Sequence, residues 1–402
     1  MLVSLMILVF AGGDLSLKGE IASESRFFDD DNWQVTQDIN SGLFGRLDLS
    51  YGSGPWKTAL RGYGRWDATD SDRNFASFEE AWVAYRTSKW HFRAGYQMLN
   101  WSATEAFHPA DSINARNWDS RVENPEKRGE PMVSLARQMA RGELTAYWMS
   151  FSTPNHMPSQ ASRLNFAAGQ AWSGTRYLDH DGSLSKSERS NQWGLRYTVN
   201  IGDGDLALHY LDHRERQQFG VAFDTSSNSL HPLLFEVREW GLTHQHVIDA
   251  WVLKIEAAYK DYPRQDLAPG ILDQTQTAFG VEYGWITGSG ASATVLFEGQ
   301  TLFGLNKTDR AAASLFQRDV LLGYRHAFND IKSREVLVSL IVDLERQTEL
   351  LFNAQYAQRI NDVFSLTIGL RWIDAKNDIK DGQGLLPLDQ ADQCSLTVTR
   401  HF

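Results

Sequence analysis

Apolar and polar residues alternate along most of the chain, and turn-forming residues separate the alternating segments. This period of two is typical of β-strands with one apolar face, and no segment of comparable length keeps the 3.6-residue period of an amphipathic helix. One segment, 334–345, also carries Leu337 and Ile341 on its otherwise polar face. The segment 363–375 alternates more strictly, with Phe364, Leu366, Ile368, Leu370 and Trp372 opposed by Ser365, Thr367, Gly369 and Arg371.

The lengths of the connections indicate how these strands are arranged. Connections after even-numbered strands are short and those after odd-numbered strands are mostly long, with one exception near Gln347. Short periplasmic turns and long extracellular loops are typical of outer-membrane barrels. The sequence therefore predicts an all-β fold, a transmembrane antiparallel up-and-down β-barrel of about 18 strands (16–20) over residues 14–402. The predicted strands are 14–27, 35–51, 56–68, 76–88, 90–99, 131–140, 142–152, 190–201, 205–214, 235–248, 250–261, 276–288, 291–303, 315–328, 334–345, 348–360, 363–375 and 391–402.

Aromatic residues fall where a barrel would meet the two membrane interfaces. Trp56 and Trp66 share one face of a strand and are ten residues apart, which at ~3.3 Å per residue and ~40–45° tilt gives a rise of ~23–25 Å. The last strand ends at Phe402, and such an ending resembles the C-terminal signal that the barrel-insertion machinery recognises. Arg400 shares the apolar face of that strand, so it is expected near an interface.

Residues 1–13 resemble the apolar core and cleavage site of a secretory signal, although a basic start is absent. The alternative is a buried first strand or core helix. The apolar run is about ten residues long, whereas a membrane-spanning helix needs ~20. Export combined with β-structure predicts the bacterial outer membrane as the location.

Charge and composition exclude several other functions. The formal net charge of −11 disfavours nucleic-acid binding, and a single cysteine, Cys394, excludes an intramolecular disulfide and a cysteine-based zinc site. The G-x-G-x-x-A pattern at 202–207 lies between two predicted strands, so it indicates a hairpin turn and not a dinucleotide site. No cofactor, metal site or catalytic residue is predicted. A membrane enzyme would need a loop pair such as Ser152 and His156, which the sequence does not place together.

If the apolar faces contact lipid, the opposite faces line the lumen. The alternation of residues along each strand then predicts one inward stripe of basic residues on neighbouring strands, and this stripe would favour anionic solutes. The alternative is that inward arginines and carboxylates pair and only maintain the barrel shape. The stripe comprises Arg46, Arg61, Arg65, Arg86 and Arg93, and other inward residues are Arg196, Lys254, Glu256, Glu282 and Arg371.

The connection 100–130 is too long and mixed to be an ordinary turn, and structureless loops of this length are usually functional. The sequence favours an inward fold that narrows the pore over an outward loop that covers the mouth. The residues singled out in it are Trp101, Pro109, Asp111 and Asn114.

The segment 93–135 resembles a family of proteobacterial outer-membrane barrels that is grouped with porins and has no assigned function. The matching positions are Gly95, Gln97, Trp101, Pro109, Asp111, Asn114 and Pro131, whereas Ser102 and His108 depart from the family pattern. The resemblance implies a pore or transporter and supplies no catalytic residues.

The expected function is that of a porin-like channel that passes small solutes, anionic or carboxylate-bearing ones in particular, and is not an enzyme. The alternatives are an outer-membrane lipid-modifying enzyme and a closed barrel with an adhesion or scaffold role. The expected partners are outer-membrane lipid and lipopolysaccharide, small solutes and the insertion machinery, and no nucleic acid.

Overall fold

The computed structural model describes residues 13–29, 38–179, 181–266, 271–346, 349–375 and 384–402. The predicted signal segment, apart from Gly13, and the brief turn near Gln347 lie outside these residues. None of the helices in these ranges is long and apolar enough to cross a membrane.

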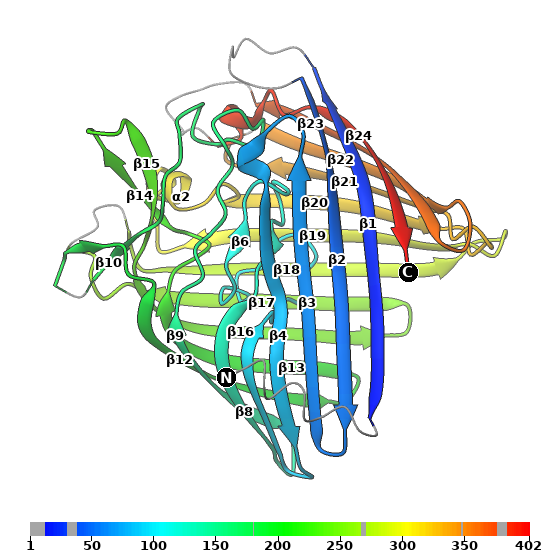
Figure 1. Cartoon of the computed structure of the whole chain (residues 1–402), viewed down its shortest axis with the longest axis horizontal. Coiled ribbons are helices and arrows are strands. Elements are labelled where there is room, and N and C mark those ends of the chain that lie inside the picture. Colours follow the sequence, from blue (N-terminus) through cyan, green and yellow to red (C-terminus); the bar gives the residue numbers. More distant parts are fainter. Residues whose placement is uncertain (1–12, 30–37, 180, 267–270, 347–348, 376–383) are drawn as a thin grey trace.

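The described residues form a closed barrel of 18 antiparallel strands, in which each strand pairs with the next and β1 pairs with β24 (Figure 1). Each predicted segment overlaps one of these strands, so the fold prediction is confirmed. The strands are β1 Asp14–Phe28, β2 Ile39–Ser53, β3 Trp56–Asp67, β4 Phe75–Arg86, β5 Trp90–Gln97, β8 Glu130–Gln138, β9 Glu143–Phe151, β12 Arg189–Ile201, β13 Gly204–Arg214, β16 Glu236–Ile248, β17 Trp251–Asp261, β18 Gln274–Ile286, β19 Ser292–Phe303, β20 Arg318–Ala327, β21 Glu335–Asp343, β22 Glu349–Arg359, β23 Phe364–Ala375 and β24 Gln393–His401.

The outer surface carries an apolar belt bounded by two aromatic girdles. Trp56 and Trp66 are 48% and 56% exposed at opposite ends of β3. Near the short turns the ring centroids of Trp56 and Tyr85 lie 4.8 Å apart, and near the long loops those of Trp193 and Tyr210 lie 5.0 Å apart. So much exposed apolar surface would be unfavourable in water but matches the hydrocarbon of a bilayer. Arg400 is outward and pairs with Phe364 at the short-turn end of β23, near an interface.

The short turns are tight hairpins. Between β12 and β13, Gly202 adopts a φ of +60°, a conformation that glycine reaches without steric cost. The G-x-G-x-x-A pattern therefore belongs to a hairpin, and the prediction of a turn at 202–204 is confirmed.

The long loops carry the remaining elements, of which β10, β14, β15 and α2 lie at the end of the barrel opposite the short turns (Figure 1). β10, β11, β14 and β15 form a four-stranded sheet, while β6 and β7 pair inside the loop between β5 and β8. These elements are β6 Arg116–Asn117, β7 Glu126–Lys127, β10 Arg176–Leu178, β11 Leu184–Ser185, β14 Gly220–Asp224, β15 Ser229–Leu234, α2 Lys307–Ala313, η1 Ser71–Arg73 and η3 Leu386–Leu388.

Candidate functional site

The chain leaves the barrel wall between β5 and β8, opposite an irregularity in β4. The register between β3 and β4 shifts after Arg61, and Glu79 turns inward to accept a hydrogen bond from Arg46 Nε at 2.9 Å. Gly95 has a φ of +129°, and a Cβ there would lie 2.1 Å from the carbonyl oxygen of Ala81. At Gly129 a Cβ would lie 2.5 Å from the carbonyl oxygen of Phe78. Both ends of the loop therefore require glycine, because its backbone approaches β4 too closely for a side chain.

Asn114 joins the two ends of the loop. Its Nδ2 donates to the carbonyl oxygens of Gln97 at 3.0 Å and Arg128 at 2.9 Å, while its Oδ1 accepts from the Leu99 amide at 2.9 Å. The side chain is fully buried, so these bonds also satisfy polar groups that water does not reach. Asn114 thus fixes the base from which residues 100–127 extend into the barrel.

Asp111 provides an ionic anchor within the loop. Its carboxylate is fully buried, pairs with Lys127 Nζ and lies 3.8 Å from Arg116 Nη2. Burial alone would raise the pKa of Asp111, but the charges of Lys127 and Arg116 outweigh that effect, so the pKa lies below its ordinary value. The loop therefore contains an ionised, paired carboxylate whose removal would leave a buried cation without its partner.

Trp101 anchors the loop to the wall. It is buried between the ring of Tyr147, with centroids 5.4 Å apart, and the ring of His209, with centroids 4.9 Å apart. The Arg196 guanidinium lies 4.6 Å from its centroid, a cation–π contact. Pro109 is also buried, so none of the four residues singled out in this loop has an exposed side chain.

Inward carboxylates on the far wall bind the backbone of the loop. Glu256 on β17 accepts the amides of Ala103 at 2.5 Å and Thr104 at 2.9 Å, and Glu298 on β19 accepts that of Ala106 at 2.9 Å. Lys254 pairs with Glu105 of the loop at 2.7 Å, and also with Glu282 of β18. The loop therefore crosses the inside of the barrel, and Lys254 and Glu256 contact it instead of lining open space, whereas Glu282 reaches it only through Lys254.

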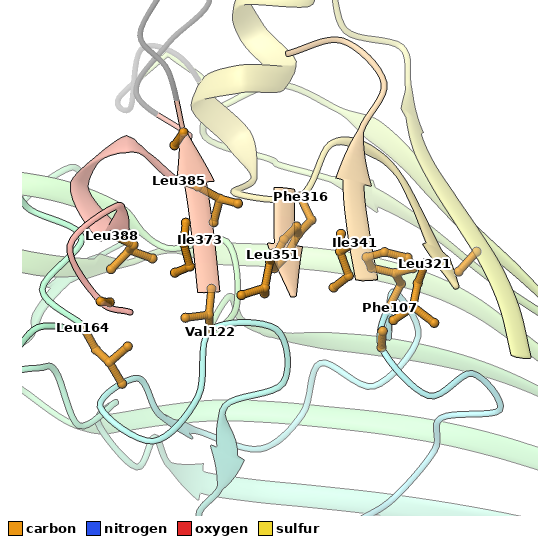
Figure 2. Close-up of a cluster of buried hydrophobic side chains, with 14 residues drawn as sticks. Phe107, Val122, Leu164, Phe316, Leu321, Ile341, Leu351, Ile373, Leu385 and Leu388 are labelled. Carbon is orange, nitrogen blue, oxygen red and sulfur yellow. The ribbon is translucent and has the colours of Figure 1, made fainter. Parts of the chain in front are cut away.

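A hydrophobic cluster attaches the loop to a second part of the wall. Figure 2 shows Phe107 and Val122 of the loop beside Ile341, Leu351 and Ile373, which project inward from β21, β22 and β23. These inward apolar residues were absent from the predicted lumen. The signal that indicates them is a strand with apolar residues on both faces, as at Leu337 and Ile341 in β21.

A lumen cavity of about 390 Å³ lies between residues 117–126 of the loop and the wall opposite. One side is charged and belongs to β1–β3, and the other carries hydroxyl and amide groups of β21–β24. Among its lining residues are Glu20, Glu24, Arg26, Arg46, Arg65, Asp119, Arg121, Glu123, Glu126, Ser339, Asn353, Gln355, Thr367, Arg371, Ser395, Thr397 and Thr399.

Three arginines of the predicted basic stripe are ion-paired. Arg46 contacts Glu79 at 2.9 Å and Glu20 at 3.3 Å. Arg61 contacts Asp48 at 2.6 Å, and Arg65 contacts Glu24 at 2.5 Å. Their charges are largely neutralised locally, which weakens the field that they project into the lumen.

Two other inward arginines, Arg93 and Arg371, form no such pair among the described residues. The Arg93 guanidinium lies 4.3 Å from the ring centroid of Trp82, and Arg371 donates to the carbonyl oxygen of Ala391 and to Gln393 Oε1, both at 3.1 Å. Within the ranges that the structure describes, neither has a carboxylate partner within 4.0 Å. Arg86, the fifth residue of the stripe, is exposed at the short-turn end of β4.

The loop residues considered for a membrane enzyme do not form a hydrogen-bonded pair in the structure. Ser152 Oγ accepts a hydrogen bond from Gln192 Nε2 at 3.1 Å, whereas the His156 ring stacks on Phe75 with centroids 4.4 Å apart. Among the described residues there is no group of three or more His, Cys, Asp or Glu side chains arranged to hold a metal ion.

Several solved structures are similar to this chain at low sequence identity. OccD3 (OpdP) of Pseudomonas aeruginosa is 11% identical over 98% of this chain and 93% of that chain, with a TM-score of 0.54. A mutant of Rh. blastica porin is 14% identical over 97% and 100% of the two chains, with a TM-score of 0.45. OmpT lacking loop L8, from Vibrio cholerae, is 11% identical over 97% and 99%, with a TM-score of 0.44.

No protein-family model matches the chain, and the comparison with curated proteins gave no match. The resemblance of segment 93–135 to one particular barrel family therefore stays a prediction. The likeness to OccD3 shows the fold, and the apolar belt shows which surface contacts lipid. The chain folds as a closed 18-stranded antiparallel β-barrel similar to that of OccD3, with an outward apolar belt that matches a bilayer.

Proposed function

We propose that the protein is an outer-membrane channel that passes small solutes through its lumen, with a preference for anionic or carboxylate-bearing ones. The observation that carries this proposal is the lumen cavity beside the inward loop, which extends towards Leu337, Thr367 and Thr399 near the short-turn ends of their strands. Passage needs no covalent step. We also expect the terminal strand ending at Phe402 to be the segment that the insertion machinery binds.

The anionic preference rests on the cations that lack carboxylate partners. Arg371 lines the lumen cavity among neutral amides and hydroxyls of β22–β24, and none of the described carboxylates forms an ion pair with it. Arg93 contributes a second unpaired charge on the inward face of β5. Fixed cations that line a narrow water-filled path favour anions.

The test is the reversal potential of the reconstituted protein in a planar bilayer under a salt gradient. Arg93→Glu and Arg61→Glu should each shift the preference towards cations, because each replaces an inward positive charge by a negative one. Lys89→Glu in an exposed short turn makes the same charge change outside the lumen and should leave the potential unchanged. An unchanged potential in Arg93→Glu would remove this residue from the mechanism. A complete lack of conductance would favour the closed-barrel alternative, and lipid hydrolysis by the reconstituted protein would favour an enzyme.

A further inference from the structure

A second cavity, the vestibule, opens at the long-loop end of the barrel. It has a volume of about 430 Å³, within the range of ~300–1,000 Å³ that is usual for small-molecule sites. Its lining is mainly apolar and includes Phe107, Trp118, Val122, Phe166 and Phe219. Three different loops contribute these residues, so only the folded structure brings them together.

Aromatic rings form one wall of the vestibule. The centroid of Trp118 lies 5.9 Å from that of Phe166 and 5.6 Å from that of Phe219, and both pairs meet edge to face. Trp172 joins the same group, 5.4 Å from Phe166. Such a cluster presents ring faces and edges at distances that favour the packing of another ring.

Three amide side chains in the lining already form hydrogen bonds. Gln217 Nε2 donates to the carbonyl oxygen of Asp111, and Gln276 Nε2 donates to Gln300 Oε1 at 3.0 Å. Gln300 Nε2 in turn donates to the carbonyl oxygen of Phe316 at 2.8 Å. A ligand that depends on many hydrogen bonds, such as a neutral sugar, would therefore have to compete with existing bonds.

Arg121 supplies a cation at the point where the vestibule meets the lumen cavity. Its side chain is exposed and lines both cavities, as does Glu123. In the part of the chain that the structure describes, Arg121 has no carboxylate within ion-pair distance. An exposed guanidinium without a partner beside an aromatic wall is suited to a ligand that combines a carboxylate with a ring.

We propose that the vestibule binds small ring-bearing carboxylates, of which benzoate is the simplest probe. The ring packs against Trp118, Phe166 and Phe219, and the carboxylate pairs with Arg121, which then transfers the ligand to the lumen cavity. The transfer step rests on the proposed channel function, whereas binding to the vestibule does not.

Titration calorimetry on the full chain in detergent tests the binding step with benzoate, acetate and benzyl alcohol. Benzoate should bind more tightly than either of the other two, which carry only the charge or only the ring. Arg121→Gln and Phe219→Ala should each raise the dissociation constant for benzoate about tenfold, the effect expected from losing one charge-assisted hydrogen bond or one buried ring contact. The matched controls are Arg189→Gln and Phe223→Ala, since both side chains are exposed at the long-loop end and do not line the vestibule.

Three results would overturn the vestibule proposal: acetate binding as tightly as benzoate, unchanged benzoate affinity in both variants, or equal losses in the controls. Planar-bilayer currents recorded with benzoate distinguish failure of the vestibule proposal from failure of the proposed channel function. Benzoate binding without any current would leave the vestibule site intact and reject transport. Current without benzoate binding would leave the channel intact and reject the vestibule site.

Discussion

The inner wall of the barrel has two regions that use similar residues differently. Under the loop, Glu239 and Glu256 are fully buried and Lys260 is 1% exposed, with its Nζ 2.7 Å from Glu215 Oε2. On β2 and β3, the side chains of Arg46 and Arg61 remain 31% and 37% exposed in their ion pairs. The same alternating pattern therefore yields a covered wall that determines the position of the loop and an open wall that water reaches.

The burial of a charged side chain determines how much its ion pair contributes to stability. Breaking a buried ion pair costs about 3–5 kcal/mol because it leaves the remaining charge without compensation, whereas an exposed pair contributes roughly 0–1 kcal/mol. The covered wall should consequently respond to substitution through stability and loop position, and the open wall through ion selectivity.

The largest effect is expected from removing the division between the two regions. Deletion of residues 101–128 should raise single-channel conductance severalfold, because the loop occupies the inside of the barrel and contacts its far wall. Single-channel recording measures this directly. Deletion of residues 222–226, in the outer four-stranded sheet, provides the control and should leave conductance unchanged. Unchanged conductance in the first deletion would mean that the loop does not restrict the pore.

A single acceptor on the covered wall should have the next largest effect. Glu256→Ala removes the carboxylate that accepts the Ala103 and Thr104 amides, so the free energy of unfolding should fall by about 3 kcal/mol. Denaturant titration of the reconstituted barrel provides the measurement. Glu335→Ala removes a partly exposed carboxylate paired with the exposed Arg325 and should cost less than about 1 kcal/mol. Equal losses in the two variants would reject the distinction between the walls.

Acidification should weaken the loop anchor at Asp111. The pKa of Asp111 is lower in the folded protein than in the unfolded chain, where it is about 3.9. The ionised carboxylate therefore stabilises the fold fully above a pH of about 3.9, and this stabilisation is lost as the pH falls through the lower pKa of the folded state. Current fluctuations from loop motion should increase over this acidic range. Asp111→Asn should show increased fluctuations already at neutral pH, together with a smaller further change on acidification. An identical acid response in both proteins would exclude Asp111 as its source.

The smallest change in stability is expected on the open wall. Arg61→Ala breaks the pair with Asp48, yet both side chains are more than a third exposed, so the free energy of unfolding should change by less than about 1 kcal/mol. The same denaturant titration checks this value. A loss as large as that in Glu256→Ala would show that the open wall is also structurally rigid.

The path of the loop was predictable only in part. Gly95, Gln97 and Asn114 were named from the sequence as positions of the family resemblance, and they lie where the chain leaves the wall. The acceptors Glu256 and Glu298 lie some 150–190 residues further along the chain, and a single sequence has no periodicity that links them to the loop. The sequence likewise did not distinguish Arg121 from the other loop residues, and only the folded structure places it between two cavities.

By itself the sequence predicted the strands, about 18 of them (16–20), and the two kinds of rim. Lipid on one side and water or protein on the other impose a period of two on every strand. Each strand can therefore be recognised from its own residues. Only the tertiary structure decided which inward charges are covered and where the vestibule forms. Those features depend on contacts between distant segments, whose burial and pairing follow from the path of one loop through the closed barrel.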